Sequence, residues 1–218
     1  MGNEIDLLKN YPRAKRNLEA RSKKTENDRK VAREFGKEFF DGDRKYGYGG
    51  FSYNPKFWSK TVIDFKKHWK LDKDNSILDV GCGKGFMIYD FIQLMPEINI
   101  KGIDISEYAI KNSKPEVSNL VQVASAESIP FGDNSFDFVI SINTIHNLSL
   151  RKCKKAIEEI SRVSNKGSFI TVDAYNNEEE KKRMYDWNLT AKTIKSVTDW
   201  KKIFKECKYK GDFYWFIP

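Results

Sequence analysis

Apolar residues follow two different spacings along this chain, and the change of spacing separates two regions. Up to about Leu71 they recur every three or four positions, as they do along one face of a helix. One stripe comprises Val31, Phe35 and Phe39, and a second comprises Trp58, Val62, Phe65 and Trp69. We expect a helix at each stripe, the second beginning at Asn54-Pro55 and ending near Leu71, because asparagine before proline is typical of a helix start.

From Ser76 onward, short β-branched runs alternate with helical patterns. The runs predict strands at Ile77–Val80, Ile98–Ile105, Leu120–Ala124, Phe136–Ile142 and Phe169–Ala174, followed by a last aromatic strand in DFYWFIP. Helices are predicted at Phe86–Leu94, Glu107–Asn112 and Thr198–Cys207, and along the stripe of Leu150, Cys153, Ile157, Ile160 and Val163. Such alternation predicts an α/β fold: a doubly wound, mostly parallel, Rossmann-like sheet with helices on both faces. We expect an N-terminal helical extension with a Tyr/Gly-rich lid over residues 1–54 and the sheet domain over residues 55–218.

Composition narrows the class of protein further. A chain of 218 residues with 39% hydrophobic and 14% aromatic residues can bury one full-sized core. It has no run of 18 apolar residues and no signal-peptide pattern at its start, so we expect a soluble, cytoplasmic protein. Three widely spaced cysteines predict reduced thiols and no metal site. The formal net charge of +8 fits a nucleic acid, an anionic metabolite or a lysine-rich background equally well.

The stretch ILDVGCGKGF places an acid, Asp79, near the end of the first predicted strand and three glycines directly after it. In a doubly wound sheet, ligands bind beyond the carboxyl ends of the strands. Gly81 and Gly83 would allow a tight turn and a close approach of ligand to main chain, and Gly85 would let the next helix close on the strand. Asp104 ends the second predicted strand, where a carboxylate can accept hydrogen bonds from ribose hydroxyls. We therefore expect an adenosine-type ligand.

The order of acid and glycines separates two classes of such ligands. The glycines follow G-x-G-x-G, whereas a dinucleotide site has G-x-G-x-x-G. Asp79, two residues before the first glycine, would repel a pyrophosphate and attract an ammonium or sulfonium group. The charge therefore favours a cationic ligand.

These segments, in this order, resemble the class I S-adenosylmethionine-dependent methyltransferases of the small bacterial type, over roughly Ser76 to Tyr175. LDVGCGKG is similar to the family's first motif, which holds the methionine part of the cofactor, and GIDIS to the second, which binds the ribose and covers the adenine. ASAESIPFGDNSFDFVIS is similar to the adenine-edge segment, although Ser125 stands where an aspartate is common. The resemblance implies S-adenosyl-L-methionine as cofactor and S-adenosyl-L-homocysteine as product. The cofactor-binding residues it implies are Asp79, Gly81, Cys82, Gly83, Gly85, Asp104, Ile105, Ala126, Glu127 and Asn143.

Candidates for the chemistry and for the acceptor site lie outside these motifs. His146 follows the fourth predicted strand on the reaction side, and we interpret it as the general base for a hydroxyl acceptor, with a structural role in the loop as the alternative. Aromatic residues outside the periodic core predict a substrate pocket formed by Tyr46, Tyr48 and Trp187, with ordinary packing of the extension as the alternative. His68 is expected at the surface or in packing.

The leading hypothesis is a methyltransferase that acts on a small polar metabolite, at oxygen, and on an anionic or sugar-linked molecule. Ser141-Ile142-Asn143-Thr144 follows the fourth strand where methyltransferases of amino groups on bases or glutamine carry an Asn/Asp-Pro-Pro-Tyr/Phe motif. Two alternatives stay open: an RNA methyltransferase whose basic first 45 residues contact phosphates, and an inactive cofactor-binding partner subunit. The sequence predicts no membrane contact and does not determine the oligomeric state or the methylated atom.

Overall fold

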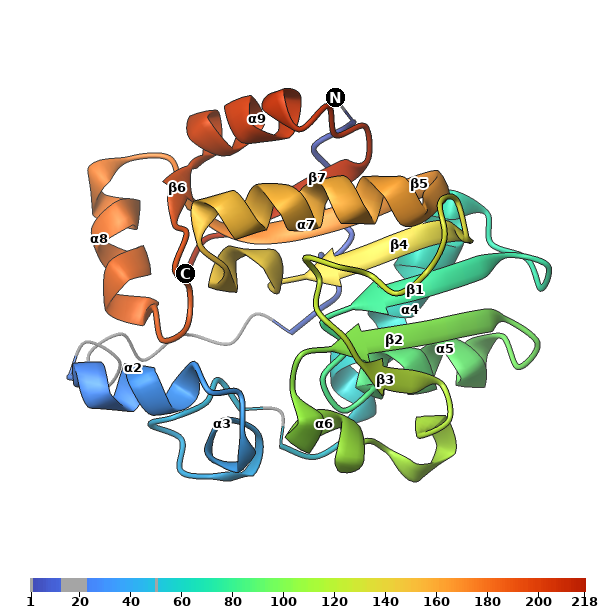
Figure 1. Ribbon diagram of the computed structural model, residues 1–218, viewed down its shortest axis with the longest axis horizontal. Coiled ribbons are helices and arrows are strands. Elements are labelled where there is room, and N and C mark those ends of the chain that lie inside the picture. Colours follow the sequence, from blue (N-terminus) through green and yellow to red (C-terminus); the bar gives the residue numbers. More distant parts are fainter. Residues whose placement is uncertain (1, 13–22, 50) are drawn as a thin grey trace.

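The computed structural model describes residues 2–12, 23–49 and 51–218 (Figure 1). Residues 13–22 of the basic N-terminal segment and Gly50 of the predicted lid lie outside the described residues. Within the described part of the chain, no helix is both long and apolar enough to cross a lipid bilayer.

A seven-stranded parallel sheet forms the centre of the described structure (Figure 1). Its strands are β1 (Ser76–Val80), β2 (Asn99–Asp104), β3 (Val121–Val123), β4 (Phe136–Ile142), β5 (Ser164–Tyr175), β6 (Lys195–Ser196) and β7 (Asp212–Phe216). The order is β3-β2-β1-β4-β5-β6, and β7 also pairs with β5. The α/β fold with a mostly parallel sheet, predicted from the alternating pattern, is confirmed. Strand β1 lies between β2 and β4, which brings Asp79 level with Gly102 and Ile140 near the carboxyl ends of all three strands.

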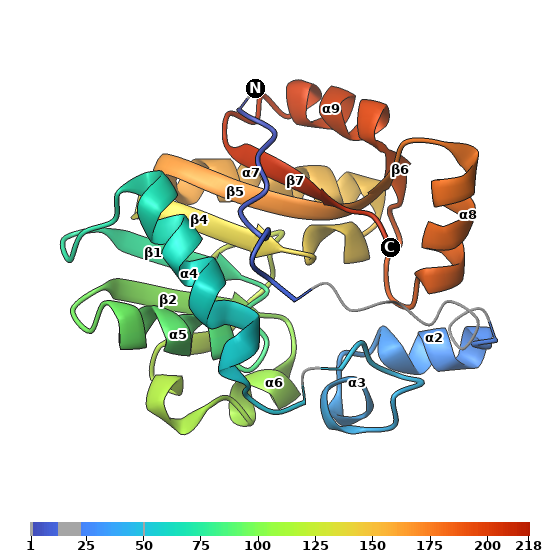
Figure 2. The same cartoon turned by 180° about the vertical axis from the view of Figure 1, so that it is seen from behind.

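Helices cover both faces of the sheet because each presents one apolar stripe to it. On one face lie α4 (Pro55–Trp69) and α5 (Phe86–Leu94), seen in front in Figure 2. On the other lie α7 (Leu150–Val163) and α9 (Val197–Glu206), seen in front in Figure 1. The short α6 (Glu107–Lys111) packs beside β2 and β3. Helix α4 begins as predicted at Asn54, whose side chain accepts a hydrogen bond from Lys56 N.

The prediction of one helix through Val31, Phe35 and Phe39 is wrong. The structure has two short helices, α2 (Glu26–Ala32) and α3 (Lys37–Asp41). Phe35 adopts a left-handed conformation with φ 49°, which ends the helical path, and Gly36 then caps α3. The rings of Phe35 and Phe39 still meet, with centroids 5.2 Å apart, so the apolar spacing reflects packing across the break.

Helix α8 (Glu178–Trp187) had no sequence signal, since its first six residues are all charged and only Met184 and Trp187 are buried. Strand β3 is shorter than predicted, and β5 begins earlier than predicted, at Ser164. Figure 1 shows α2, α3 and α8 gathered beyond the carboxyl ends of the strands. These three helices therefore enclose the edge of the sheet where ligands bind in such folds.

Candidate functional site

The glycine loop after β1 has the tight geometry that its sequence predicts. Gly81, Gly83 and Gly85 all have positive φ, at 88°, 53° and 74°. Gly81 N and Cys82 N both donate to Ile103 O, at 2.7 and 3.0 Å, which ties the loop to the end of β2. A Cβ at Gly81 would lie 2.0 Å from Thr144 Oγ1, so this glycine also makes room for the loop that follows β4.

Two carboxylates, those of the buried Asp79 and the half-buried Asp104, lie close enough at this loop for their charges to interact. Burial, and then the charge of Asp104, raises the pKa of Asp79 from 3.8 to about 8. Asp104 accepts hydrogen bonds from Gly83 N and Ser106 N, both at 2.8 Å, yet burial still raises the pKa of its carboxyl. Among the described residues no cation pairs with either side chain. Such a pair favours a ligand that brings positive charge and hydroxyl donors.

The residues expected around the adenine lie next to Asp104. Ile105 is 58% exposed, which leaves an apolar side chain open to a flat ring. Ala124 N donates to Asp104 O at 2.9 Å and so places the segment that follows β3 beside Asp104. In that segment Ala126 is half-buried, and Glu127 forms an ion pair of 2.9 Å with Lys152 of α7.

Two adjoining cavities open at the carboxyl ends of the strands. The first, of about 830 Å³, is lined by Asp79 and the glycine loop, and the second, of about 890 Å³, by Asn143, His146 and Asp173. The two cavities share seven of their lining residues: Tyr11, Pro12, Phe39, Tyr48, Trp58, Ile142 and Trp187. A ligand on the glycine loop would therefore meet a second molecule in the neighbouring cavity.

Of the three predicted pocket residues, the structure brings two together. The rings of Tyr48 and Trp187 have centroids 5.7 Å apart, and both residues line both cavities. The Tyr48 hydroxyl accepts hydrogen bonds from Leu189 N and Thr190 N, which fastens the segment around Tyr48 to the segment after α8. Tyr46 lines neither cavity.

Asn143, predicted to bind the cofactor, lines the second cavity rather than the first. Its φ is 54°, and its main-chain N donates to Thr171 Oγ1 at 3.0 Å. Cys82 is buried, and its sulfur lies against Gly102 of β2, where an added Cβ would be 2.8 Å away. Its contribution to a ligand would therefore be its main chain.

His146 is buried in a short 3-10 turn after β4. Its Nδ1 accepts a hydrogen bond of 3.1 Å from Asp173 N, and its Nε2 lies 3.6 Å from Asp173 Oδ1. With Nδ1 occupied, the neutral ring carries its proton on Nε2. Burial also lowers the pKa of His146 from 6.5 to about 3. The role of general base stays a prediction of the sequence, and this geometry supports the alternative, a histidine that holds the loop against β5.

Sequence reasoning missed residues that come from distant elements. Asp173, near the end of β5, lines the second cavity, its main-chain O accepts a hydrogen bond from Trp200 Nε1, and its N binds His146. The sequence feature that could have identified Asp173 is an acid near the carboxyl end of a predicted strand. Lys84 Nζ binds both carboxylate oxygens of Asp41, at 2.5 and 2.6 Å, and Phe51 O at 3.0 Å, and so attaches the extension to the glycine loop. In the described ranges no cluster of three or more His, Cys, Asp or Glu side chains could hold a metal ion.

Comparison with known proteins identifies the family to which the chain belongs. A family model described as a methyltransferase domain matches residues 71–212. The chain is 33% identical over 145 residues to a tRNA (carboxymethyluridine(34)-5-O)-methyltransferase of Arabidopsis thaliana, covering 66% of this chain and 33% of that protein. It is 29% identical over 133 residues to the ubiquinone/menaquinone biosynthesis C-methyltransferase UbiE of Campylobacter jejuni, covering 56% of this chain and 54% of the relative. The chain thus spans between a third and about half of the length of these relatives.

Among solved structures, the YcgJ protein from Bacillus subtilis superimposes with a TM-score of 0.52 at 20% sequence identity. The alignment covers 66% of this chain and 65% of that chain. At this level of identity the likeness supports the fold alone.

Proposed function

The chain belongs to the family of methyltransferase domains, and from that premise we propose that it transfers the methyl group of S-adenosylmethionine to an oxygen of a small polar metabolite, anionic or sugar-linked. The observation that carries the proposal is the pair of adjoining cavities, one with Asp79 and the glycine loop, the other walled by aromatic rings. One would hold the methyl donor and the other the acceptor.

The residues of the first cavity and its border fit the cofactor. Asp79 would bind the ammonium group of the methionine part, because a buried carboxylate with a pKa of about 8 is stabilised in its charged form by a cation. Asp104 would accept hydrogen bonds from the ribose hydroxyls, and the exposed Ile105 would cover the adenine. When bound, the cofactor supplies a methyl group already activated by positive sulfur. The protein then has to align the acceptor and exclude water.

The second cavity would perform that alignment. Its aromatic walls, among them Tyr48, Trp58 and Trp187, would hold the acceptor and keep water from the reacting atoms. Asp173 would accept a hydrogen bond from the acceptor hydroxyl, and His146, which accepts a hydrogen bond from Asp173 N, would hold the end of β5 in place. An acceptor that is already anionic would need no base.

Two alternatives remain open to experiment. An RNA acceptor is favoured by the likeness to the Arabidopsis protein, whose name gives tRNA as its substrate. The second alternative is a cofactor-binding partner subunit without catalysis. A small acceptor is favoured by the position of the second cavity, which lies between the extension, α8 and the end of β7.

The test combines a transfer assay with a binding assay. Radiolabelled S-adenosylmethionine is incubated with the protein and a panel of small hydroxylated acids and sugar derivatives, and in parallel fluorescence anisotropy measures tRNA binding at two salt concentrations. We expect methyl transfer to a small acceptor and no steep salt dependence of tRNA binding. Transfer to tRNA alone would replace the proposal with the RNA alternative, and cofactor binding without transfer to any acceptor would favour the partner subunit.

A further inference from the structure

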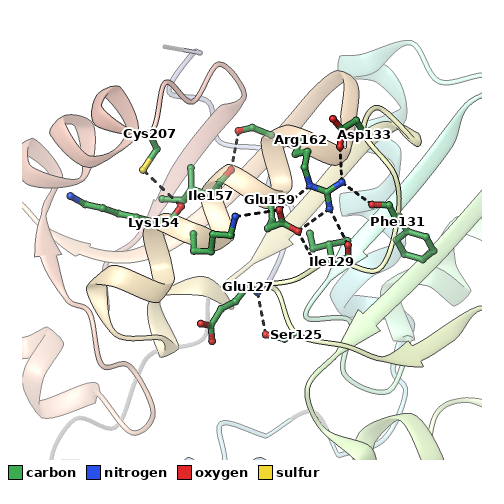
Figure 3. Close-up of polar contacts among 12 residues, drawn as sticks. Ser125, Glu127, Ile129, Phe131, Asp133, Lys154, Ile157, Glu159, Arg162 and Cys207 are labelled. Carbon is green, nitrogen blue, oxygen red and sulfur yellow. Dashed lines mark hydrogen bonds and ion pairs between the residues drawn. The ribbon is translucent and has the colours of Figure 1, made fainter.

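The segment after β3, residues 125–134, which we name the adenine-edge loop, is held by charged side chains of α7 (Figure 3). Glu159 Oε2 accepts a hydrogen bond of 2.9 Å from Ile129 N. Arg162 donates to Ile129 O at 3.0 Å, to Phe131 O at 2.8 Å and to Asp133 Oδ1 at 2.9 Å. Two side chains one turn apart on α7 thus satisfy main-chain groups at alternate positions of the loop.

Glu159 and Arg162 also hold each other in a fixed geometry. Arg162 Nε and NH2 donate to the two carboxylate oxygens of Glu159, both at 2.8 Å, in the paired arrangement that a planar guanidinium favours. Hydrogen bonds from Arg162 lower the pKa of Glu159 to about 2, and those to Glu159 raise the pKa of Arg162. Both groups therefore stay charged over the whole range in which a protein is folded. Glu159 is 7% exposed and the Arg162 side chain 30%, so water screens this pair less than a fully exposed ion pair.

The loop has few ties of its own. Among the described residues its internal main-chain hydrogen bonds run from Ser128 N to Ser125 O and from Phe131 N to Ile129 O. Helix α7 also binds the two ends of the loop. Near the start, Lys152 forms an ion pair with Glu127, and at the end Asn134 N donates to Arg162 O. Helix α7 therefore holds the loop along its length, while Ala124 N ties its start to β2 and the ring of Phe131 packs on Phe136 of β4.

That position matters for the cofactor because of the residue at 125. An aspartate there would reach the amino group of adenine by its side chain, but Ser125 is shorter and its hydroxyl accepts a hydrogen bond from Glu127 N within the loop. The edge of the base would then meet main-chain groups of the loop. Main-chain groups recognise a base only if the whole segment is held at the right distance from the ribose carboxylate, Asp104.

We propose that Glu159 and Arg162 are positioning residues for the cofactor: they hold the adenine-edge loop beside Asp104 and thereby give the site its preference for adenine over other bases. The inference rests on the proposed function, since it needs an adenosine-type cofactor. It predicts that substitution of either residue changes the ratio of the affinities for adenine and for other bases, and not only the stability of the fold.

The test measures dissociation constants by calorimetry for S-adenosylhomocysteine and for its analogue with hypoxanthine in place of adenine. The variants are Arg162→Ala, Arg162→Lys, which keeps the charge but has three donors on one nitrogen in place of the five hydrogen bonds from three nitrogens that Arg162 makes, and a matched control, Lys154→Ala. Lys154 lies on the same helix and points away from the loop (Figure 3). Its ion pair of 2.6 Å is with Glu206 of α9. We expect both Arg162 variants to bind S-adenosylhomocysteine at least about tenfold more weakly and to lose at least about threefold of the preference for adenine. The control should keep both values.

The outcomes separate this inference from the function on which it rests. A wild-type protein that does not bind S-adenosylhomocysteine would overturn the proposed function itself. A wild-type protein that binds it, together with Arg162 variants of unchanged affinity or unchanged preference between the two bases, would overturn only the role of the pair. If Arg162→Ala does not fold, as judged by circular dichroism, Arg162→Lys decides alone.

Discussion

Asp79 is the single residue whose surroundings say most about the ligand. Its carboxyl lies at the end of the central strand, buried, with a second carboxyl across the glycine loop and no cation among the described side chains. In most proteins a buried acid is paired. Here its partner would arrive with the ligand, so the site without ligand holds a proton that a cationic ligand would displace.

The raised pKa of Asp79 leads to a prediction about the free energy of unfolding. Because the pKa of Asp79 is about 8 in the folded protein and 3.8 in an ordinary environment, unfolding releases a proton between these values, and the contribution of this residue to stability falls as the pH rises from about 4 to about 8. Asp79→Asn, which cannot ionise, should become more stable relative to the wild type by up to about 1.4 kcal/mol per pH unit over that window. Urea unfolding at pH 5 and pH 7.5 measures the difference, and parallel pH profiles for the two proteins would show that Asp79 is ionised in the free site.

His146 supports a second prediction at this scale. His146→Ala would leave Asp173 N buried without its partner, which costs about 1–3 kcal/mol, or roughly 3–10 °C in melting temperature for a chain of this size. Differential scanning calorimetry of the variant, with the partly exposed His68→Ala as control, tests this. A variant with normal melting temperature but turnover reduced by about a hundredfold would restore the role of general base.

At the scale of elements, the extension is attached to the glycine loop by one partly buried ion pair. Lys84, the residue between the second and third glycines, binds Asp41 at the end of α3 and Phe51 O in the segment that follows. Tyr108 of α6 also donates to Asp41, and Ser106 Oγ donates to Phe35 O. The extension is thus bound to the loops that would hold the methionine and the ribose, and its closure and the cofactor should stabilise each other.

Lys84→Ala should therefore loosen the extension and weaken the cofactor together. Loss of a partly buried, charge-assisted hydrogen bond costs about 1.5–3 kcal/mol, which predicts at least about tenfold faster proteolysis between residues 23 and 54 and a weaker affinity for S-adenosylhomocysteine. Limited proteolysis with and without ligand, beside Lys166→Ala as a control at the opposite end of the sheet, measures both effects. Unchanged cleavage in Lys84→Ala would mean that packing of Phe39 and Phe40 holds the extension by itself.

At the scale of the whole molecule, ligand binding should raise the stability of the fold, because both cavities are bounded by elements far apart in the sequence. S-adenosylhomocysteine at about 100 times its dissociation constant should add about 2.7 kcal/mol, or roughly 6 °C in melting temperature for 218 residues. NAD should give no shift, since Asp79 would face its pyrophosphate. A thermal shift with NAD and none with S-adenosylhomocysteine would contradict the assignment of the glycine loop.

The parts of the site that could be predicted are those formed within one strand–turn–helix unit. The acid and glycines at Asp79 to Gly85, and Asp104 at the end of the next strand, are positioned by local backbone geometry together with the rule that parallel strands end at one edge of a sheet. Their positions could therefore be predicted from residue type and spacing, and their role toward the cofactor stays a prediction. The same holds for the sheet and its two layers of helices, because apolar periodicity decides which face of each element is buried.

Contacts between distant segments were decided only by the tertiary structure. Lys84 and Asp41 are 43 positions apart, Tyr48 and Leu189 are 141, and Arg162 and Ile129 are 33. Each contact depends on the direction in which a helix or a loop packs, which the local sequence pattern does not determine. The local pattern also failed at Phe35, where a regular apolar spacing continues across a break between two helices. The sequence by itself determined the layers of the fold and the place of the glycine loop and its two acids, because these depend on hydrophobic periodicity and local turns. The orientation of His146, the acid at Asp173 and the fastening of the adenine-edge loop depend on long-range packing, and only the tertiary structure decided them.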